Sequence, residues 1–323
     1  MLTEKPAAKP LPKTGVRPDG DVVCWFEGKW VPLADAKVGI MTHGFLYGTA
    51  VFEGIRAYWN EEQGQLYALQ ARAHYERMTD SARVMLMDPG RSVDELIELT
   101  VELLRRNAYR EDAYVRPTLY KSTEAIGVRL HNLDCQLNVF AVPFGEYIAI
   151  DRGISAQTVS WRRNSDLSIP SRSKIVGAYV NSAFSKTEAQ LNGFDEAIVL
   201  TLDGHVSEGS AENLFMVRKG QLITPGVEDD ILEGVTRAAM MQLAKNELGL
   251  DTLVRAMDRS ELYVADEIFL CGTGAQISPV TSVDHRPVGT GDVGPITQRL
   301  MALYFDAVRG RLPAYSDWLT PIY

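Results

Sequence analysis

Three side chains in the second half of the chain have the types and spacing that covalent cofactor chemistry requires. Lys174 lies in the run 169–182, Tyr179 follows five residues later, and Glu208 lies further along the chain. A lysine amine can condense with an aldehyde, a tyrosine hydroxyl can hold a phenolic oxygen, and a carboxylate can keep a pyridine nitrogen protonated. Together these residues predict an enzyme that uses pyridoxal phosphate.

Each of the three also has an ordinary structural interpretation. A single lysine is usually a solvated charge, Tyr179 could be a packed aromatic residue at a helix start, and Glu208 could be an acidic turn residue. The apolar residues 175–178 favour the functional interpretation of Lys174, because an apolar setting disfavours the charged form of an amine. The small residues among 207–213 favour it for Glu208, because they let the backbone approach a ligand closely.

A phosphate group needs anion donors, and three segments could provide them. Residues 234–236 precede a predicted helix, so their amides would point at an anion from its N-terminus, although they could also be a plain helix cap. The loop 271–275 follows a predicted strand and offers amides and the Thr273 hydroxyl. Arg77 could add a charge-assisted contact, although an arginine on an amphipathic helix is usually solvated.

Two other patterns do not support a function. Residues 289–294 match G-x-G-x-x-G, but only 29 residues follow, too few to complete a dinucleotide-binding unit, so we predict a turn and a helix entry. His43 and His74 are too isolated to predict a metal site.

Composition narrows the class of protein. The chain has 323 residues, of which 46% are hydrophobic and 23% charged, which is typical of a globular protein of one or two domains. Its formal net charge of −9 argues against general affinity for nucleic acid. No segment approaches the roughly 18 uninterrupted apolar residues of a membrane span, and no secretory signal is evident, so we expect a cytoplasmic protein.

The predicted elements alternate between strands and helices, which indicates an α/β protein of two domains, and we expect the site to lie at their interface. We expect a loose tail over 1–21, a smaller N-terminal domain over 22–147, a polar interdomain connection over 148–170 and a larger C-terminal domain over 171–323. Apolar periodicity and capping signals predict helices over 71–87, 93–107, 180–191, 236–248 and 295–308. Short apolar or β-branched runs predict strands over 51–59, 113–120, 136–143, 196–200, 214–217 and 222–224, with others near 253 and 268.

The stretch from about 22 to 310 resembles the branched-chain amino acid aminotransferases, members of the class IV (fold type IV) pyridoxal phosphate enzymes. The resemblance depends on four motifs in the family's order, at 47–56, 114–117, 208–215 and 234–237. It implies that Lys174 is the Schiff-base lysine and the catalytic residue. It further implies a cofactor site formed by Arg77, Lys174, Tyr179, Glu208, Ala211, Asn213, Leu232, Gly234, Val235, Thr236 and Thr273. The implied substrate pocket comprises Tyr47, Phe52, Arg56, Tyr114, Arg116, Phe144, Tyr147, Thr273 and Gly274.

The resemblance also implies an activity. We expect transfer of the amino group of leucine, isoleucine or valine to 2-oxoglutarate, which gives branched-chain 2-oxo acids and L-glutamate, in a homodimer or higher homo-oligomer. Aromatic walls suit the branched side chains, and an arginine at the edge of the pocket can receive the distal carboxylate of glutamate. Phe144 lies where some members carry tryptophan.

Other activities remain open on the sequence alone. A D-amino acid transaminase, an (R)-selective amine transaminase and an aminodeoxychorismate lyase share the fold, and Arg129 lies in a loop where such specificities diverge. From a different class, a catalytically silent pyridoxal phosphate carrier would keep the same cofactor residues.

Overall fold

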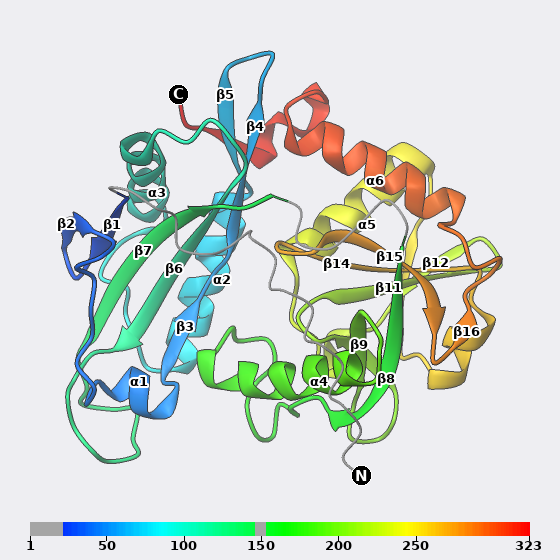
Figure 1. The fold of residues 1–323 in the computed structure, drawn as a ribbon, viewed down its shortest axis with the longest axis horizontal. Helices are drawn as coiled ribbons and strands as arrows, with labels where there is room; N and C mark the ends of the chain where they lie inside the picture. The colour runs from blue at the N-terminus through cyan, green and yellow to red at the C-terminus, as the bar shows by residue number, and fades with distance from the viewer. Residues whose placement is uncertain (1–21, 146–152) are drawn as a thin grey trace, which may run out of the picture.

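The computed structural model describes residues 22–145 and 153–323, whose strands form two sheets on opposite sides of the molecule (Figure 1). Tyr147, the N-terminal tail and the start of the expected connection lie outside the described residues. In the described part of the chain, no helix is both long and apolar enough to cross a membrane.

The first sheet has eight strands, all paired antiparallel, in the order β17-β5-β4-β6-β7-β1-β2, with β3 added beside β6. Inward residues of its central strands, such as Val115 and Val139, are fully buried beneath α2 and α3. Leu96 and Leu103 pack on them from α3, at the helical spacing that the sequence predicted. The strands are β1 (Val23–Phe26), β2 (Lys29–Pro32), β3 (Ala50–Phe52), β4 (Ile55–Asn60), β5 (Gln65–Leu69), β6 (Ala113–Lys121), β7 (Cys135–Pro143) and β17 (Leu319–Pro321). The helices on this side are α1 (His43–Tyr47), α2 (Ala71–Val84) and α3 (Val93–Asn107).

The second sheet has nine strands in the order β10-β9-β8-β15-β14-β11-β12-β13, with β16 beside β15. It is mixed, because β8 pairs parallel with both β9 and β15, and β12 with β13. The strands are β8 (Ile154–Arg162), β9 (Glu196–Leu200), β10 (Val206–Gly209), β11 (Asn213–Arg218), β12 (Gln221–Thr224), β13 (Thr252–Val254), β14 (Glu267–Gly272), β15 (Gln276–Val283) and β16 (Arg286–Pro287). The helix α4 (Tyr179–Leu191) packs on β8 and β9, whereas α5 (Val235–Leu248) and α6 (Pro295–Val308) pack on β14. Short 3-10 helices cover Val176–Ala178, Val227–Asp229, Arg259–Val264 and Pro313–Trp318.

Most predicted elements are present within one to three residues of the expected bounds, and the G-x-G-x-x-G match is, as predicted, a turn whose last glycine caps α6. The expected connection over 148–170 is wrong for residues 154–162, which form β8 inside the second sheet. The first six residues of β8 are mostly buried, but its last three are exposed, which gave the whole segment a polar composition. The chain also returns at its end to the first sheet, where β17 pairs with β5.

Candidate active site

A cavity of about 510 Å³ lies between the two sheets and is lined by residues from both. Sixteen of the site residues predicted from the sequence line it, and they come from eight separate segments of the chain. They are Phe52, Arg77, Tyr114, Arg116, Phe144, Lys174, Tyr179, Glu208, Ala211, Asn213, Leu232, Gly234, Val235, Thr236, Thr273 and Gly274. Among the described residues, no group of histidine, cysteine and acidic side chains could hold a metal ion.

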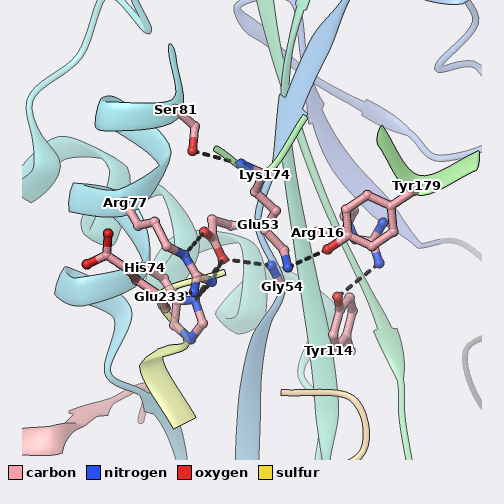
Figure 2. Close-up of polar contacts among 10 residues, drawn as sticks. All are labelled: Glu53, Gly54, His74, Arg77, Ser81, Tyr114, Arg116, Lys174, Tyr179 and Glu233. Carbon is pink, nitrogen blue, oxygen red and sulfur yellow. Dashed lines mark hydrogen bonds and ion pairs between the residues drawn. The ribbon is translucent and has the colours of Figure 1, made fainter. Parts of the chain in front are cut away.

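Lys174 is anchored to the first sheet by its backbone, and its side chain extends into the cavity (Figure 2). Its amide donates to Ser81 Oγ at 3.1 Å, and its carbonyl accepts from the amide of Phe52 at 3.1 Å. Nζ donates to the Tyr179 hydroxyl at 2.8 Å and lies 5.0 Å from the centre of the Phe52 ring. The amine is therefore held at a defined point beside a hydroxyl and two aromatic rings.

Glu208 is the buried carboxylate of the cavity, with 3% of its surface exposed. Oε1 pairs with Arg163 at 2.7 Å, and Oε2 accepts from Asn213 Nδ2 at 2.9 Å and from the Leu232 amide at 3.1 Å. A carboxylate has about four acceptor positions, so these partners leave room for one further donor. Burial raises the pKa of Glu208 against the opposing charge of Arg163. An added cationic N–H in the cavity would offset that burial, which fits a protonated ring nitrogen.

The part of the cavity at the start of α5 is suited to an anion. Gly234 caps α5, and the amides of Val235 and Thr236 lie in the first turn of this helix, where no intrahelical acceptor exists for them. A Cβ at Gly234 would lie 1.9 Å from Asn213 Oδ1, so only glycine lets the helix start so close to the Glu208 network. Arg77 lies beside this helix start and donates from NH1 to the carbonyl of Glu233 at 2.9 Å.

Aromatic and cationic side chains form the wall on the first sheet. Arg116 NH2 donates to the Tyr114 hydroxyl at 2.9 Å, and its guanidinium lies 4.5 Å from the centre of the Phe52 ring. Its buried Nε has no hydrogen-bond partner among the described residues, so this arginine has donor capacity left for a ligand. Gly54 is required beside this wall, because a Cβ there would lie 2.0 Å from the Tyr114 hydroxyl oxygen.

Two residues expected in the substrate pocket do not line the cavity in the described part of the chain. Arg56 is 1% exposed, and it donates to the carbonyls of Phe144 at 2.8 Å and Gly274 at 3.2 Å, so it joins the two halves of the protein. Tyr47 lies on α1 with 37% of its surface exposed, and its hydroxyl accepts from the Gly127 amide at 3.3 Å. Both side chains form hydrogen bonds with residues far away in the sequence, and the local motif does not reveal these contacts.

The sequence interpretation missed a group of charged residues in the cavity wall. Lys186 Nζ pairs with the Glu196 carboxylate and donates to the Asp195 carbonyl at 2.9 Å. Glu212 lies nearby and is 6% exposed. Burial and then the charge of Glu196 raise the pKa of Glu212 to about 8, against the charge of Lys186. The sequence did contain a signal for Glu212, because this residue lies in the same run of small residues that pointed to Glu208.

The raised pKa of Glu212 predicts how stability depends on pH. The folded state holds its proton more tightly than the unfolded chain, so the stabilising contribution is complete below the ordinary pKa of 4.5 and is lost as pH rises through about 8. Glu212→Gln should therefore be more stable than the original protein at pH 8, on the order of 4 kcal/mol, and nearly equal at pH 4.5.

Urea unfolding at a series of pH values measures this difference. Glu98→Gln, at an exposed position on α3, is the matched control and should follow the original protein at every pH. If the difference in unfolding free energy between Glu212→Gln and the original protein does not change with pH, the assignment of the raised pKa is wrong.

Comparison with known proteins agrees with this geometry. The family model for amino-transferase class IV matches residues 50–283. A protein of Aquifex aeolicus (strain VF5), named as a probable branched-chain-amino-acid aminotransferase, is 50% identical over 299 residues, which are 93% of this chain and 96% of that protein.

Solved structures agree in fold as well as in sequence. A branched-chain aminotransferase from Thermoproteus uzoniensis with norvaline is 41% identical, has a TM-score of 0.90, and is matched over 94% of this chain and 100% of that chain. One from Thermobaculum terrenum in its PLP form is 36% identical, with a TM-score of 0.89 and coverage of 94% and 99%. With its family model matched over most of its length, this chain belongs to the class IV aminotransferases.

Proposed function

We propose that this protein is a pyridoxal phosphate-dependent branched-chain-amino-acid aminotransferase. In this function it transfers the amino group of leucine, isoleucine or valine to 2-oxoglutarate and releases a branched-chain 2-oxo acid and L-glutamate. The observation that carries the proposal is the position of Lys174 Nζ, in one cavity with the buried Glu208 carboxylate and the anion-binding start of α5. The names of the relatives and their solved structures support the same assignment over the D-amino acid, (R)-amine and lyase alternatives.

The residues around the cavity fit this cofactor. Lys174 would bond to its aldehyde carbon, Tyr179 would hold its phenolic oxygen, and Glu208 would accept from its ring nitrogen, within a wall completed by Ala211, Asn213 and Leu232. Arg77, Thr273 and the amides of Val235 and Thr236 would bind its phosphate. When bound, the cofactor supplies an electron sink for the electron pair left when the substrate Cα loses its proton.

Lys174 then acts as a general base and general acid. Its Nζ would take the proton from the substrate Cα as a base and give it up again as an acid, while the Tyr179 hydroxyl keeps the amine in place. The carboxylate of Glu208 would favour a protonated ring nitrogen, and its burial excludes water that would weaken this charge pairing.

The substrate side of the cavity fits two kinds of amino acid in turn. Phe52, Tyr114 and Phe144 supply apolar surface for a branched side chain. Arg116 would receive the distal carboxylate of glutamate, because its buried Nε keeps an unused N–H among these rings. Arg129, by contrast, is exposed and does not line the cavity of its own chain.

We further propose that the protein works in the cytoplasm as a homodimer. Phe45 next to Tyr47, and Ile126 and Val128 beside the Tyr47 hydrogen bond, are 68%, 81% and 87% exposed. Such clustered apolar surface is favourably buried between two copies of a chain.

A panel of amino donors tests the activity. The purified protein should turn over L-leucine, L-isoleucine and L-valine with 2-oxoglutarate as acceptor, because the aromatic wall and Arg116 fit both partners. Assays of D-alanine and (R)-1-phenylethylamine, each with 2-oxoglutarate and with pyruvate, serve as comparisons. Faster turnover of either comparison donor than of L-leucine would reassign the substrate, and no turnover of any donor would leave only a cofactor carrier.

A further inference from the structure

Behind the wall of the cavity, Glu53, His74 and Arg77 form a buried hydrogen-bonded cluster (Figure 2). Glu53 has no exposed surface, and His74 is 2% exposed. Arg77 makes a two-pronged contact with the Glu53 carboxylate, from Nε to Oε1 at 2.7 Å and from NH2 to Oε2 at 2.8 Å. His74 Nδ1 lies 2.8 Å from Oε2, so both oxygens of Glu53 are engaged.

Contacts within the cluster and its burial determine which of the three side chains carry a charge. Although burial acts to raise it, Arg77 and His74 hold the pKa of Glu53 below its ordinary value, so the carboxylate is ionised. Burial lowers the pKa of His74, so its ring is neutral and Nδ1–H donates to Glu53. A neutral histidine beside a paired carboxylate and guanidinium leaves the cluster without net charge. Attraction of an anion here must therefore come from the orientation of N–H groups.

Hydrogen-bond geometry defines that orientation. Two of the five N–H groups of Arg77 are directed at Glu53, and a third donates to the Glu233 carbonyl just before the cap of α5. The remaining two are available to a ligand in the cavity that Arg77 lines. Glu53 is itself anchored, because its Oε2 accepts from the Gly54 amide at 3.2 Å, beside the wall residue Phe52.

We infer that Glu53 is a positioning residue for the cofactor phosphate, and that it acts by fixing the guanidinium plane of Arg77 next to the start of α5. This inference rests on the proposed function, since it takes Arg77 as a phosphate ligand. A two-pronged contact to a rigid carboxylate orders a flexible arginine before the ligand binds, which lowers the entropy lost on binding. Glu53 itself is not among the residues that line the cavity.

The test compares a ligand with and without phosphate. Pyridoxamine 5'-phosphate and pyridoxamine bind without a covalent bond to lysine, so their dissociation constants, measured by fluorescence on the full chain freed of cofactor, isolate the phosphate contribution. Glu53→Gln should weaken pyridoxamine 5'-phosphate by roughly 10- to 100-fold, by analogy with outer partners that orient metal ligands. Binding of pyridoxamine should change less than about twofold.

Three further variants separate positioning from packing. Glu53→Asp keeps the charge but shortens its reach, and should show a smaller loss confined to the phosphorylated ligand. In an Arg77→Met background, Glu53→Gln should have almost no further effect on either ligand. Glu267→Gln removes a similarly buried acid that caps α6 far from Arg77, and should leave the ratio of the two affinities unchanged.

Equal weakening of both ligands by Glu53→Gln and Glu53→Asp, or no weakening by either, would overturn the inference. A failure of the proposed function would be detected separately, by an experiment on the original protein. If borohydride does not attach pyridoxal phosphate to Lys174 there, the assignment of the cofactor site is wrong whatever the Glu53 variants do.

Discussion

Replacement of Lys174 with alanine should abolish transamination, on the order of a 10⁶-fold loss in turnover, as when a covalent catalytic residue is removed from other enzymes. The side chain has two roles that no neighbour can take over, because it bonds to the cofactor and then moves the proton at the substrate Cα. The variant should also lose the visible absorbance of the lysine-bound cofactor. Steady-state assay with L-leucine and an absorbance spectrum measure the two effects.

A second lysine in the same cavity makes this test sharper. Lys186 also lines the cavity, but its Nζ is paired with Glu196 and donates to the Asp195 carbonyl. A protonated, paired amine has no lone pair for an aldehyde, so borohydride reduction followed by mass spectrometry should place the cofactor on Lys174 alone. Lys245→Ala, at an exposed ion pair on α5, is the control and should stay coloured and active. The cofactor mass on Lys186, or an active Lys174→Ala variant, would refute the mechanism.

Site residues whose main contacts lie nearby in the sequence could be predicted from the sequence. Lys174 and Tyr179 are five positions apart in the sequence and hydrogen-bond to each other, and the glycine before α5 is a local cap. The helix bounds followed from apolar spacing in the same way, as α6 illustrates with its predicted limits at 295 and 308. Local signals are enough wherever a side chain's partner lies within a few residues.

Residues whose partners lie far along the chain were not predictable. Arg163 pairs with Glu208 only because β8 and β10 are both placed beside β9 in the second sheet, and its own segment looked like a polar linker. Arg56 looked like a substrate ligand, but its guanidinium donates to the backbone carbonyls at 144, 145 and 274. Glu53 went unnoticed inside a motif, because its partner Arg77 lies on α2, 24 positions away. In each case tertiary contacts decide whether a charge is structural or faces a ligand.

The second large effect on activity is expected from a change at Glu208, the partner of Arg163. Glu208→Gln should leave the cofactor bound, because an amide oxygen can still accept from Asn213 and the Leu232 amide. It should slow loss of the substrate α-proton by roughly 10²- to 10³-fold, as removal of one preorganised electrostatic group does in other enzymes. The amide carries no negative charge to hold a proton on the ring nitrogen, so the electron sink is weakened.

Single-turnover kinetics with L-leucine and with its α-deuterated form measure this step directly. In the variant the isotope effect should increase, because proton loss becomes the slow step, while the cofactor content of the protein stays the same. Glu98→Gln provides the control, as an exposed position that does not line the cavity. An unchanged rate and isotope effect would remove Glu208 from the role assigned to it.

A variant of Arg163 tests whether the slower reaction of Glu208→Gln comes from the lost charge or from a disturbed hydrogen bond. In Glu208→Gln its guanidinium, only 11% exposed, loses its carboxylate partner and becomes an uncompensated cation near the ring nitrogen, where it further disfavours protonation. The double variant with Arg163→Gln removes that cation and should recover part of the rate, although either single change slows the reaction. If the two losses simply add, charge at the ring nitrogen does not control the step, and the damage is one of packing.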